Sequence, residues 1–234
     1  MPPIFLTARW HNLLNITYSV SPELLLPHLP TGVLLDVQDG KAFVSLVAFD
    51  FLDTRLKGFA VPFHINFPEI NLRFYVLRNG ERGVCFINEF VPKYAIAWTA
   101  RLLYNEPYRC HPMYSKTQSD AQNIFSEYSI CKNGHTHTLT VEADKHPFLP
   151  DSSSLIHYFK EHETGYGITR RGKTLAYHVA HPVWQIYPIK KTSLQIDFGQ
   201  LYGEKWRFLN NQNPILNIFA QGSEVAVHHP YLLC

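Results

Sequence analysis

The ten residues 67–76, FPEINLRFYV, place a carboxylate, an amide, a guanidinium and a phenol at alternate positions. With the period of two that a β-strand imposes, one face of this segment is apolar and the other carries Glu69, Asn71, Arg73 and Tyr75. A carboxylate can act as a general acid or base, and a guanidinium can hold an organic acid. Periodicity alone leaves two alternatives open: this face meets bulk water, or it lines an enclosed cavity where the same groups do chemistry.

The two charged members of this face need partners from elsewhere. Glu69 and Arg73 are four residues apart, which is roughly 13 Å along a strand, so they cannot pair directly. Each must meet a side chain of a neighbouring strand or a ligand. A second cation, Arg101, falls near the end of a predicted helix on the same side as Tyr94 and Trp98. It is as well explained by the helix dipole as by a role in binding.

Other kinds of site find less support. His135 and His137 could point the same way from one strand, as metal ligands do, but no third ligand accompanies them, so we predict no metal. The chain has no serine or cysteine in a nucleophile elbow and no glycine loop of the phosphate-binding type, and we expect no cofactor.

Composition narrows the class of protein. The 234 residues carry a formal net charge of +2 with no basic run, which argues against a nucleic-acid partner. No segment approaches the ~18 consecutive apolar residues of a membrane span, and the amino terminus does not read as a signal peptide. The 4 cysteines are scattered, as is usual for reduced thiols. We therefore expect a cytoplasmic globular protein that contacts no membrane.

The pattern of turns predicts the architecture. Asp39-Gly40, Asn79-Gly80, Asn133-Gly134 and Arg171-Gly172 each separate two strand-like runs, and such hairpins favour an antiparallel sheet. Helical spacing marks residues 93–105, where Ile96, Ala100 and Leu103 share a face, and residues 154–163, which follow serines able to cap a helix. A short helix is expected after Ser21. We predict one α+β domain, 1–234, that is mainly antiparallel β and closes into a barrel to remove its edges.

Several stretches in consistent order resemble one family. They are RWHNLLNITYSVSPELLLPHLPTG, DGKAFVSLVAF, FPEINLRFYV, RGVCFINEF, AWTARLLYNEPY and YFKEHETGYGITRRGKTLAYHVAHPVW, and they lie between residues 9 and 184. Together they are similar to the YqjF-like family of unknown function, in the acetoacetate decarboxylase-like superfamily. The resemblance implies a bent antiparallel sheet that closes into a cone-like barrel, with a few helices outside and a cavity within.

The catalytic lysine of the decarboxylases has no counterpart at the matching place. There the resemblance points to NEPYRCHPM, which offers Tyr108 and Arg109 but no lysine, while Lys190-Lys191 lies much later in the chain. The segment FPE does resemble a decarboxylase strand whose glutamate faces the active cavity. By this resemblance Glu69 faces inward, and the polar face lines the lumen.

Our leading hypothesis is a protein that binds a small, anionic organic molecule, a carboxylate, inside a barrel and acts on it as a lyase-type enzyme without a Schiff base. Glu69 is the predicted acid or base, and the predicted binding residues are Asn71, Arg73, Tyr75, Arg101 and Tyr108. The alternative is a non-catalytic binding or assembly module that retains the fold only. A homo-oligomer is compatible with either.

Overall fold

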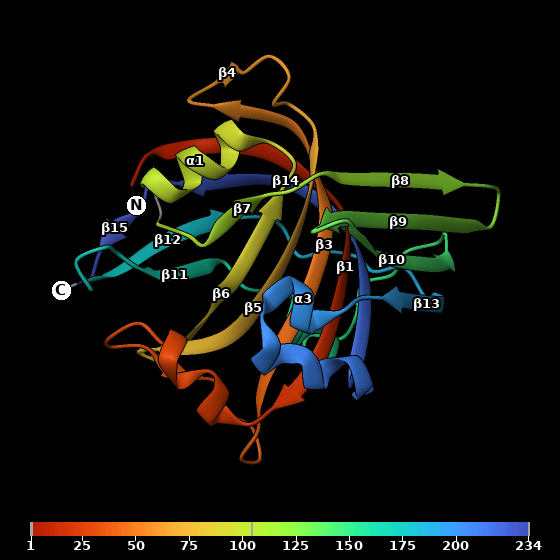
Figure 1. Cartoon of the computed structure of the whole chain (residues 1–234). Coiled ribbons are helices and arrows are strands. Elements are labelled where there is room, and N and C mark those ends of the chain that lie inside the picture. Colours follow the sequence, from red (N-terminus) through yellow and green to blue (C-terminus); the bar gives the residue numbers. More distant parts are fainter. Residues whose placement is uncertain (1, 104, 234) are drawn as a thin grey trace.

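A ring of strands forms the body of the protein (Figure 1). A computed structural model describes residues 2–103 and 105–233, with the side chain of Leu103 left out of the description. Within these residues an 11-stranded sheet contains the order β5-β3-β1-β14-β12-β11-β6, and pairing of β5 with β6 closes this path on itself. The fold is mainly antiparallel β, as the sequence predicts.

The ring is built from long, bent strands and shorter closing ones. The long strands are β1 (Ile4–Val20), β3 (Ala42–Leu56), β5 (Phe67–Arg78), β6 (Glu81–Val91) and β14 (Leu216–His228). The closing strands are β11 (Thr164–Ile168) and β12 (Thr174–Ala180), and β7 (Tyr108–Cys110) continues beside β6. Short strands β2 (Leu34–Leu35), β4 (Phe59–Ala60) and β15 (Tyr231–Leu232) pair with β5, β3 and β12.

A second sheet of four strands projects beside the ring (Figure 1). Its strands are β8 (Met113–Ser119), β9 (Asn123–Lys132), β10 (His135–Asp144) and β13 (Ile189–Gln195), in the order β13-β10-β9-β8. The hydroxyl of Tyr128 in this sheet donates to the backbone carbonyl of Asn12 in β1 at 2.7 Å. Asn12 has a positive φ of 56°, and the register of β1 against β3 shifts there. This irregularity bends β1 where the two sheets meet.

Three of the four predicted hairpins are confirmed. β5–β6, β9–β10 and β11–β12 pair antiparallel across the turns that contain Gly80, Gly134 and Gly172, whose φ angles are all positive. The turn at Gly40 differs from the prediction, because β2 pairs with β5 instead of β3. An isolated bridge between Gln38 and Lys41 flanks that turn.

The helices of the protein are short. α1 (Tyr94–Leu103) and α2 (Leu155–Lys160) fall within the predicted segments, and Ser154 caps α2 by accepting the backbone N–H of His157. The side chain of Leu103, which is predicted to share a helix face with Ile96 and Ala100, is outside the described part of the structure. The segment after Ser21 forms two single 3-10 turns, η1 (Pro22–Leu24) and η2 (Leu26–His28), without a side-chain cap. α3 (Phe198–Tyr202) and η3 (Glu204–Asn211) were not predicted.

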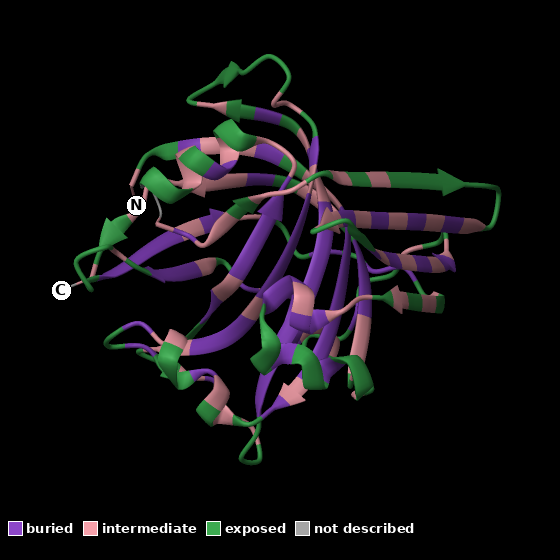
Figure 2. Ribbon diagram, viewed as in Figure 1, coloured by how far each residue is buried: buried purple, intermediate pink, exposed green. Residues whose placement is uncertain are grey.

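Both faces of β5 are buried, which answers the question raised by its sequence. Ile70, Leu72, Phe74 and Val76 belong to one hydrophobic core. Tyr75, on the opposite face, belongs to a second core. Figure 2 shows the buried strands of the ring in purple. The polar face of β5 therefore points into the enclosed interior instead of bulk water.

No described helix has both the length and the apolar character needed to cross a membrane. Cys85, Cys110 and Cys131 are free thiols, and Cys234 lies outside the described residues.

Candidate functional site

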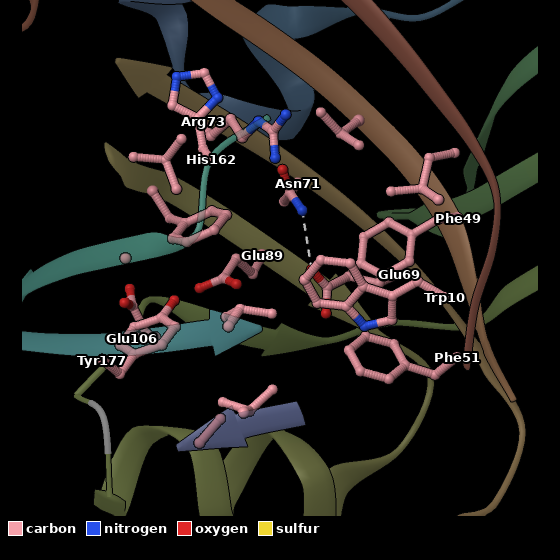
Figure 3. Close-up of a pocket in the computed structure, with 18 of the residues that line it drawn as sticks. Trp10, Phe49, Phe51, Glu69, Asn71, Arg73, Glu89, Glu106, His162 and Tyr177 are labelled. Atoms are coloured by element: carbon pink, nitrogen blue, oxygen red, sulfur yellow. Dashed lines mark hydrogen bonds between the residues drawn. The ribbon is translucent and has the colours of Figure 1, made fainter. Parts of the chain in front are cut away.

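A cavity of about 120 Å³ lies among the strands of the ring (Figure 3). Aromatic rings from two strands form one wall: Trp10 of β1 with Phe49 and Phe51 of β3. The Trp10 ring lies 5.0 Å from that of Phe49 and 5.8 Å from that of Phe51. The polar groups of the lining are Glu69, Asn71, Arg73, Glu89, Glu106, Tyr108, Lys160, His162, Thr164 and Tyr177. An apolar wall next to a few convergent polar groups is typical of a small-molecule site.

Glu69 is held in a fixed orientation inside this cavity. Its Oε1 accepts a hydrogen bond from Asn71 Nδ2 at 2.9 Å, and its Oε2 accepts one from the hydroxyl of Tyr108 at 2.8 Å. Burial raises the pKa of the Glu69 carboxyl to about 7, against the opposing effects of these two hydrogen bonds and of the charge on Arg73. The group can therefore give and take a proton near neutral pH.

Two further glutamates form a carboxyl pair beside Glu69. Burial raises the pKa of Glu89 well above its ordinary value, with a further contribution from the charges of Glu106 and Glu69. Burial likewise raises the pKa of Glu106 to about 8, opposed by a hydrogen bond from Tyr177. The pair shares a side-chain hydrogen bond in which the protonated carboxyl of Glu89 donates to Glu106. Two like charges this close cannot both ionise readily.

Arg73 lies at the other end of the polar face. One of its terminal nitrogens donates to the backbone carbonyl of Phe159 at 3.1 Å, and its guanidinium carbon lies 5.8 Å from the centre of the Tyr75 ring. It makes no ion pair with any residue in the described part of the chain, and its buried Nε–H has no acceptor there. The neighbouring His162 is kept neutral, because burial and then the charge of Arg73 lower its pKa well below the usual value.

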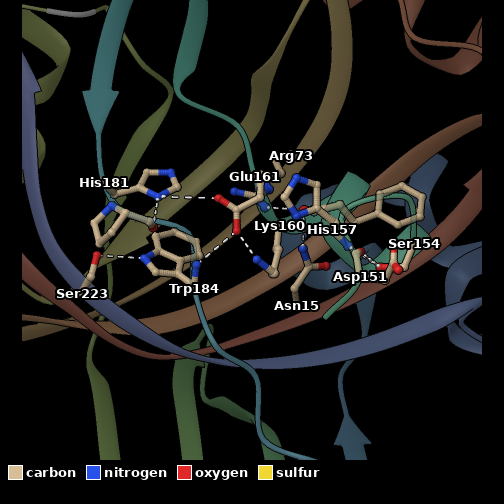
Figure 4. Close-up of polar contacts among 12 residues, drawn as sticks. Asn15, Arg73, Asp151, Ser154, His157, Lys160, Glu161, His181, Trp184 and Ser223 are labelled. Carbon is tan, nitrogen blue, oxygen red and sulfur yellow. Dashed lines mark hydrogen bonds and ion pairs between the residues drawn. The ribbon is translucent and has the colours of Figure 1, made fainter. Parts of the chain in front are cut away.

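A lysine also reaches the cavity, from the end of α2 (Figure 4). Lys160 is 3% exposed, and its ammonium pairs with the Oε1 atom of Glu161. The same oxygen accepts the backbone N–H of Trp184 at 3.2 Å, and the other oxygen lies 3.9 Å from Nδ1 of His181. The Trp184 indole in turn donates to Ser223 at 2.8 Å. This network satisfies Lys160 without using any of the three cavity glutamates.

The structure brings together four of the six predicted site residues. Glu69, Asn71, Arg73 and Tyr108 all line the cavity. Tyr75 is not part of the lining; its hydroxyl lies 3.4 Å from the carbonyl of Phe159, the same carbonyl that Arg73 contacts.

Arg101, which is among the predicted binding residues, lies away from the other members and does not line their cavity. Its Nε donates to the backbone carbonyl of Tyr108 at 2.6 Å, and its side chain lines a separate surface hollow with Trp98 and Arg109. α1 packs against the ring through Ala97 and Ile96, so the side carrying Tyr94, Trp98 and Arg101 turns outward. The spacing that groups these three residues is right, but the group faces the surface.

Three functional candidates were missed from the sequence: Glu89, Glu106 and Lys160. Glu89 lies opposite Asn71 in the β5–β6 register. Cross-strand neighbours share a sheet face, so this hairpin pairing could have indicated that Glu89 lies on the same face as Asn71. Glu106 precedes β7 in an irregular segment, and Lys160 ends a short helix, so neither has a periodic pattern. Among the described residues no group of three histidine, cysteine, aspartate or glutamate side chains is arranged to hold a metal ion.

Sequence comparison assigns the chain to a family. The profile of DUF2071, described as an uncharacterised conserved protein, matches residues 7–224. The chain belongs to the DUF2071 family. A curated relative, the uncharacterised protein YqjF of Bacillus subtilis (strain 168), is 27% identical over 176 residues, which cover 75% of this chain and 72% of YqjF. The resemblance inferred from the sequence motifs is thereby confirmed.

Solved structures with the same fold extend the comparison. An acetoacetate decarboxylase from Legionella pneumophila superposes with a TM-score of 0.67 at 12% identity, covering 100% of this chain and 89% of its own. An acetoacetate decarboxylase-like enzyme from Sphingomonas wittichii RW1 gives 0.66 at 12% identity, covering 99% and 94%. The enduracididine biosynthesis enzyme MppR complexed with pyruvate gives 0.68 at 13% identity, covering 100% and 91%. At these identities the DUF2071 chain shares the fold, the acetoacetate decarboxylase-like ring.

Proposed function

We propose that this protein is a cytoplasmic enzyme of the lyase type that binds a small organic acid in the ring cavity and moves a proton with Glu69. One observation carries the proposal. Arg73, which has no ion-pair partner in the described chain, and Glu69, whose pKa is raised to about 7, line the same cavity. Arg73 would hold the carboxylate of the ligand, and Glu69 would face the carbon skeleton. A fold neighbour described as complexed with pyruvate supports a keto acid as the kind of ligand.

Arg73 suits an anionic ligand because nothing in the described chain neutralises it. A buried guanidinium is costly without a counter-charge, and a carboxylate can accept two parallel hydrogen bonds from it. The free Nε–H offers one of these bonds. The bond to the carbonyl of Phe159 fixes the orientation of the guanidinium before the ligand arrives.

Glu69 suits proton transfer because its pKa of about 7 lies close to ordinary working pH. In its ionised form it can take a proton from a carbon next to a carbonyl, and the electron pair left behind moves onto the carbonyl oxygen. In its protonated form it can donate a proton to the carbon that a group such as carbon dioxide has left, and it then regains a proton from water. Asn71 and Tyr108 hold the carboxyl in place throughout.

The first test measures ligand binding and catalytic turnover separately. We expect members of a panel of small keto and hydroxy acids to raise the melting temperature of the protein. Glu69→Gln should retain this stabilisation but lose about a hundredfold or more in any turnover found, which is the usual contribution of a general acid or base. A protein that no acid of the panel stabilises would contradict the proposal. Binding without turnover would favour the non-catalytic alternative.

A second prediction concerns covalent chemistry. Borohydride treatment in the presence of pyruvate or acetoacetate should leave no lysine adduct in the mass spectrum. Lys160 is the lysine to inspect, because it lines the cavity, but its nitrogen is engaged with the carboxylate of Glu161 and is not free to attack a carbonyl. Lys93, Lys190 and Lys191 do not line the cavity. A reduced adduct mapped to Lys160 would show that Schiff-base chemistry occurs from α2.

A further inference from the structure

At the acidic end of the cavity, several buried oxygen atoms have no hydrogen-bond donor among the described residues. Glu89 Oε2 and Glu106 Oε1 are buried and receive no hydrogen bond from any N–H or hydroxyl of the described chain. The hydroxyls of Tyr108 and Tyr177 contribute hydrogen bonds to Glu89 and Glu106, but these two oxygens remain without a donor. Asn71 Oδ1, two residues before Arg73 on β5, is also buried and lacks a donor among the described residues. A ligand that fits these atoms must bring hydrogen-bond donors to them.

The same end of the cavity has an excess of potential negative charge. Three buried carboxyls, of Glu69, Glu89 and Glu106, lie close enough to influence one another. The charge of Arg73 acts on Glu69, and no described cation forms a salt bridge with Glu89 or Glu106. Lys160 is already matched by Glu161. The Glu89–Glu106 pair therefore has no counter-ion in the described protein, and its cost is met by protonation.

We propose that the ligand carries, besides the carboxylate held by Arg73, a cationic nitrogen that sits against Glu89 and Glu106. This inference rests on the proposed function for the anionic end and adds the chemical class of the other end: an amino acid or a related zwitterion with separated charges. The nitrogen takes the place of the proton in the carboxyl pair, and its N–H groups satisfy the two unmatched oxygens. Figure 3 shows Arg73 at one end, Asn71 between, and Glu89 and Glu106 toward the other end.

The register of the strands limits the length of such a ligand. Glu89 lies opposite Asn71, and Arg73 is two residues further along β5. Two residues of a strand span roughly 7 Å, so the charges of the ligand should be separated by a chain of about three to five carbon atoms. The aromatic wall of Trp10, Phe49 and Phe51 borders this path and suits the methylene groups between the charges.

The experiment compares ligands that differ in one group. The probes are γ-aminobutyrate, δ-aminovalerate and ε-aminocaproate, each paired with the acid in which a methyl group replaces the ammonium: valerate, caproate and heptanoate. We expect the best amino acid to bind at least about tenfold more tightly than its methyl partner, as measured by calorimetry on the full chain. The double variant Glu89→Gln/Glu106→Gln should lose that preference while still binding the methyl acids.

The proton balance gives an independent readout. Because the cation replaces a proton, binding of the amino acid should release protons into the buffer, and its affinity should rise as the pH increases through about 8. Binding of the methyl acids should show neither effect at this pair. The other titratable or charged groups that face the pair are Glu69 and Arg73 of β5, Cys85 of β6, Tyr108 of β7, Lys160 of α2, His162, and Tyr177 of β12.

The outcomes separate this inference from the proposed function. Equal affinity for the amino and methyl acids in the wild-type protein would overturn the cationic site and leave the anionic site standing. A preference that survives in the double variant would also overturn it, since the ammonium would then bind elsewhere. Failure of both series to bind, together with failure of the keto-acid panel, would overturn the proposed function itself.

Discussion

Replacing Arg73 with lysine should weaken the binding of small carboxylic acids about thirtyfold. Lysine keeps the charge but offers one ammonium in place of a flat pair of donors, so the bidentate contact with a carboxylate is lost. A charge-assisted bond of this kind is worth about 2 kcal/mol, which corresponds to about thirtyfold in affinity. The fold should be retained, because Arg73 makes no ion pair with the described chain and is anchored there by the carbonyl of Phe159.

Thermal-shift titration of the two proteins against the same acids measures this effect. Arg101→Lys is the matched control, because Arg101 undergoes the same chemical change outside the cavity. Its affinities should equal those of the wild type. If Arg73→Lys also binds as the wild type does, Arg73 is not the anion anchor. If Arg101→Lys is the variant that weakens binding, the surface hollow beside α1 becomes the better candidate for the site.

The unliganded protein should lose stability as the pH rises from about 5 to 9. A carboxyl whose pKa is raised in the folded state carries no penalty below its unfolded value, and the penalty grows until the pH passes the folded value. For Glu69 the loss of stability extends from the ordinary pKa of a glutamate to a pH of about 7, and for Glu106 it extends to a pH of about 8. Glu106→Gln removes one of these penalties while its amide oxygen can still accept the hydrogen bond of Tyr177.

We expect Glu106→Gln to raise the free energy of unfolding at pH 9 by roughly 3 kcal/mol, and to change it little at pH 5. In a chain of this size the corresponding gain in melting temperature is roughly 10 °C. Glu224→Gln, at an exposed position, is the control and should have no such effect. A variant less stable than the wild type at pH 9 would show that the Glu106 charge is matched in the protein.

Measurements below pH 5 report different groups. The pKa values of Asp120, Asp144 and Asp151 lie below the ordinary value, because backbone or side-chain hydrogen bonds stabilise their ionised forms. Their contribution to stability is present above the unfolded pKa and disappears as the pH falls through the folded pKa. The two pH ranges therefore report on different carboxyls.

Local sequence patterns are enough to predict several of the strands and one face of the site. Asn-Gly turns fix where a hairpin reverses, because only residues that tolerate positive φ fit there, and they predicted β5–β6 and β9–β10 correctly. Alternation fixes which side chains share a strand face, so the residue order alone groups Glu69, Asn71 and Arg73. Local chemistry and local geometry are enough for both conclusions.

Tertiary packing decides that this face points into the interior and which residues lie opposite it. The pairing of β5 with both β3 and β6 makes its polar face part of the wall of a cavity. The alternation of polar and apolar residues would be the same if that face were exposed to solvent. Glu89, Glu106 and Lys160 come from three separate segments of the chain and line one cavity only when the ring closes. Arg101 is a second example. Helical spacing groups it correctly with Trp98, but it does not determine which side of the helix packs against the rest of the protein. Contacts between residues distant in sequence depend on packing, which no local pattern encodes.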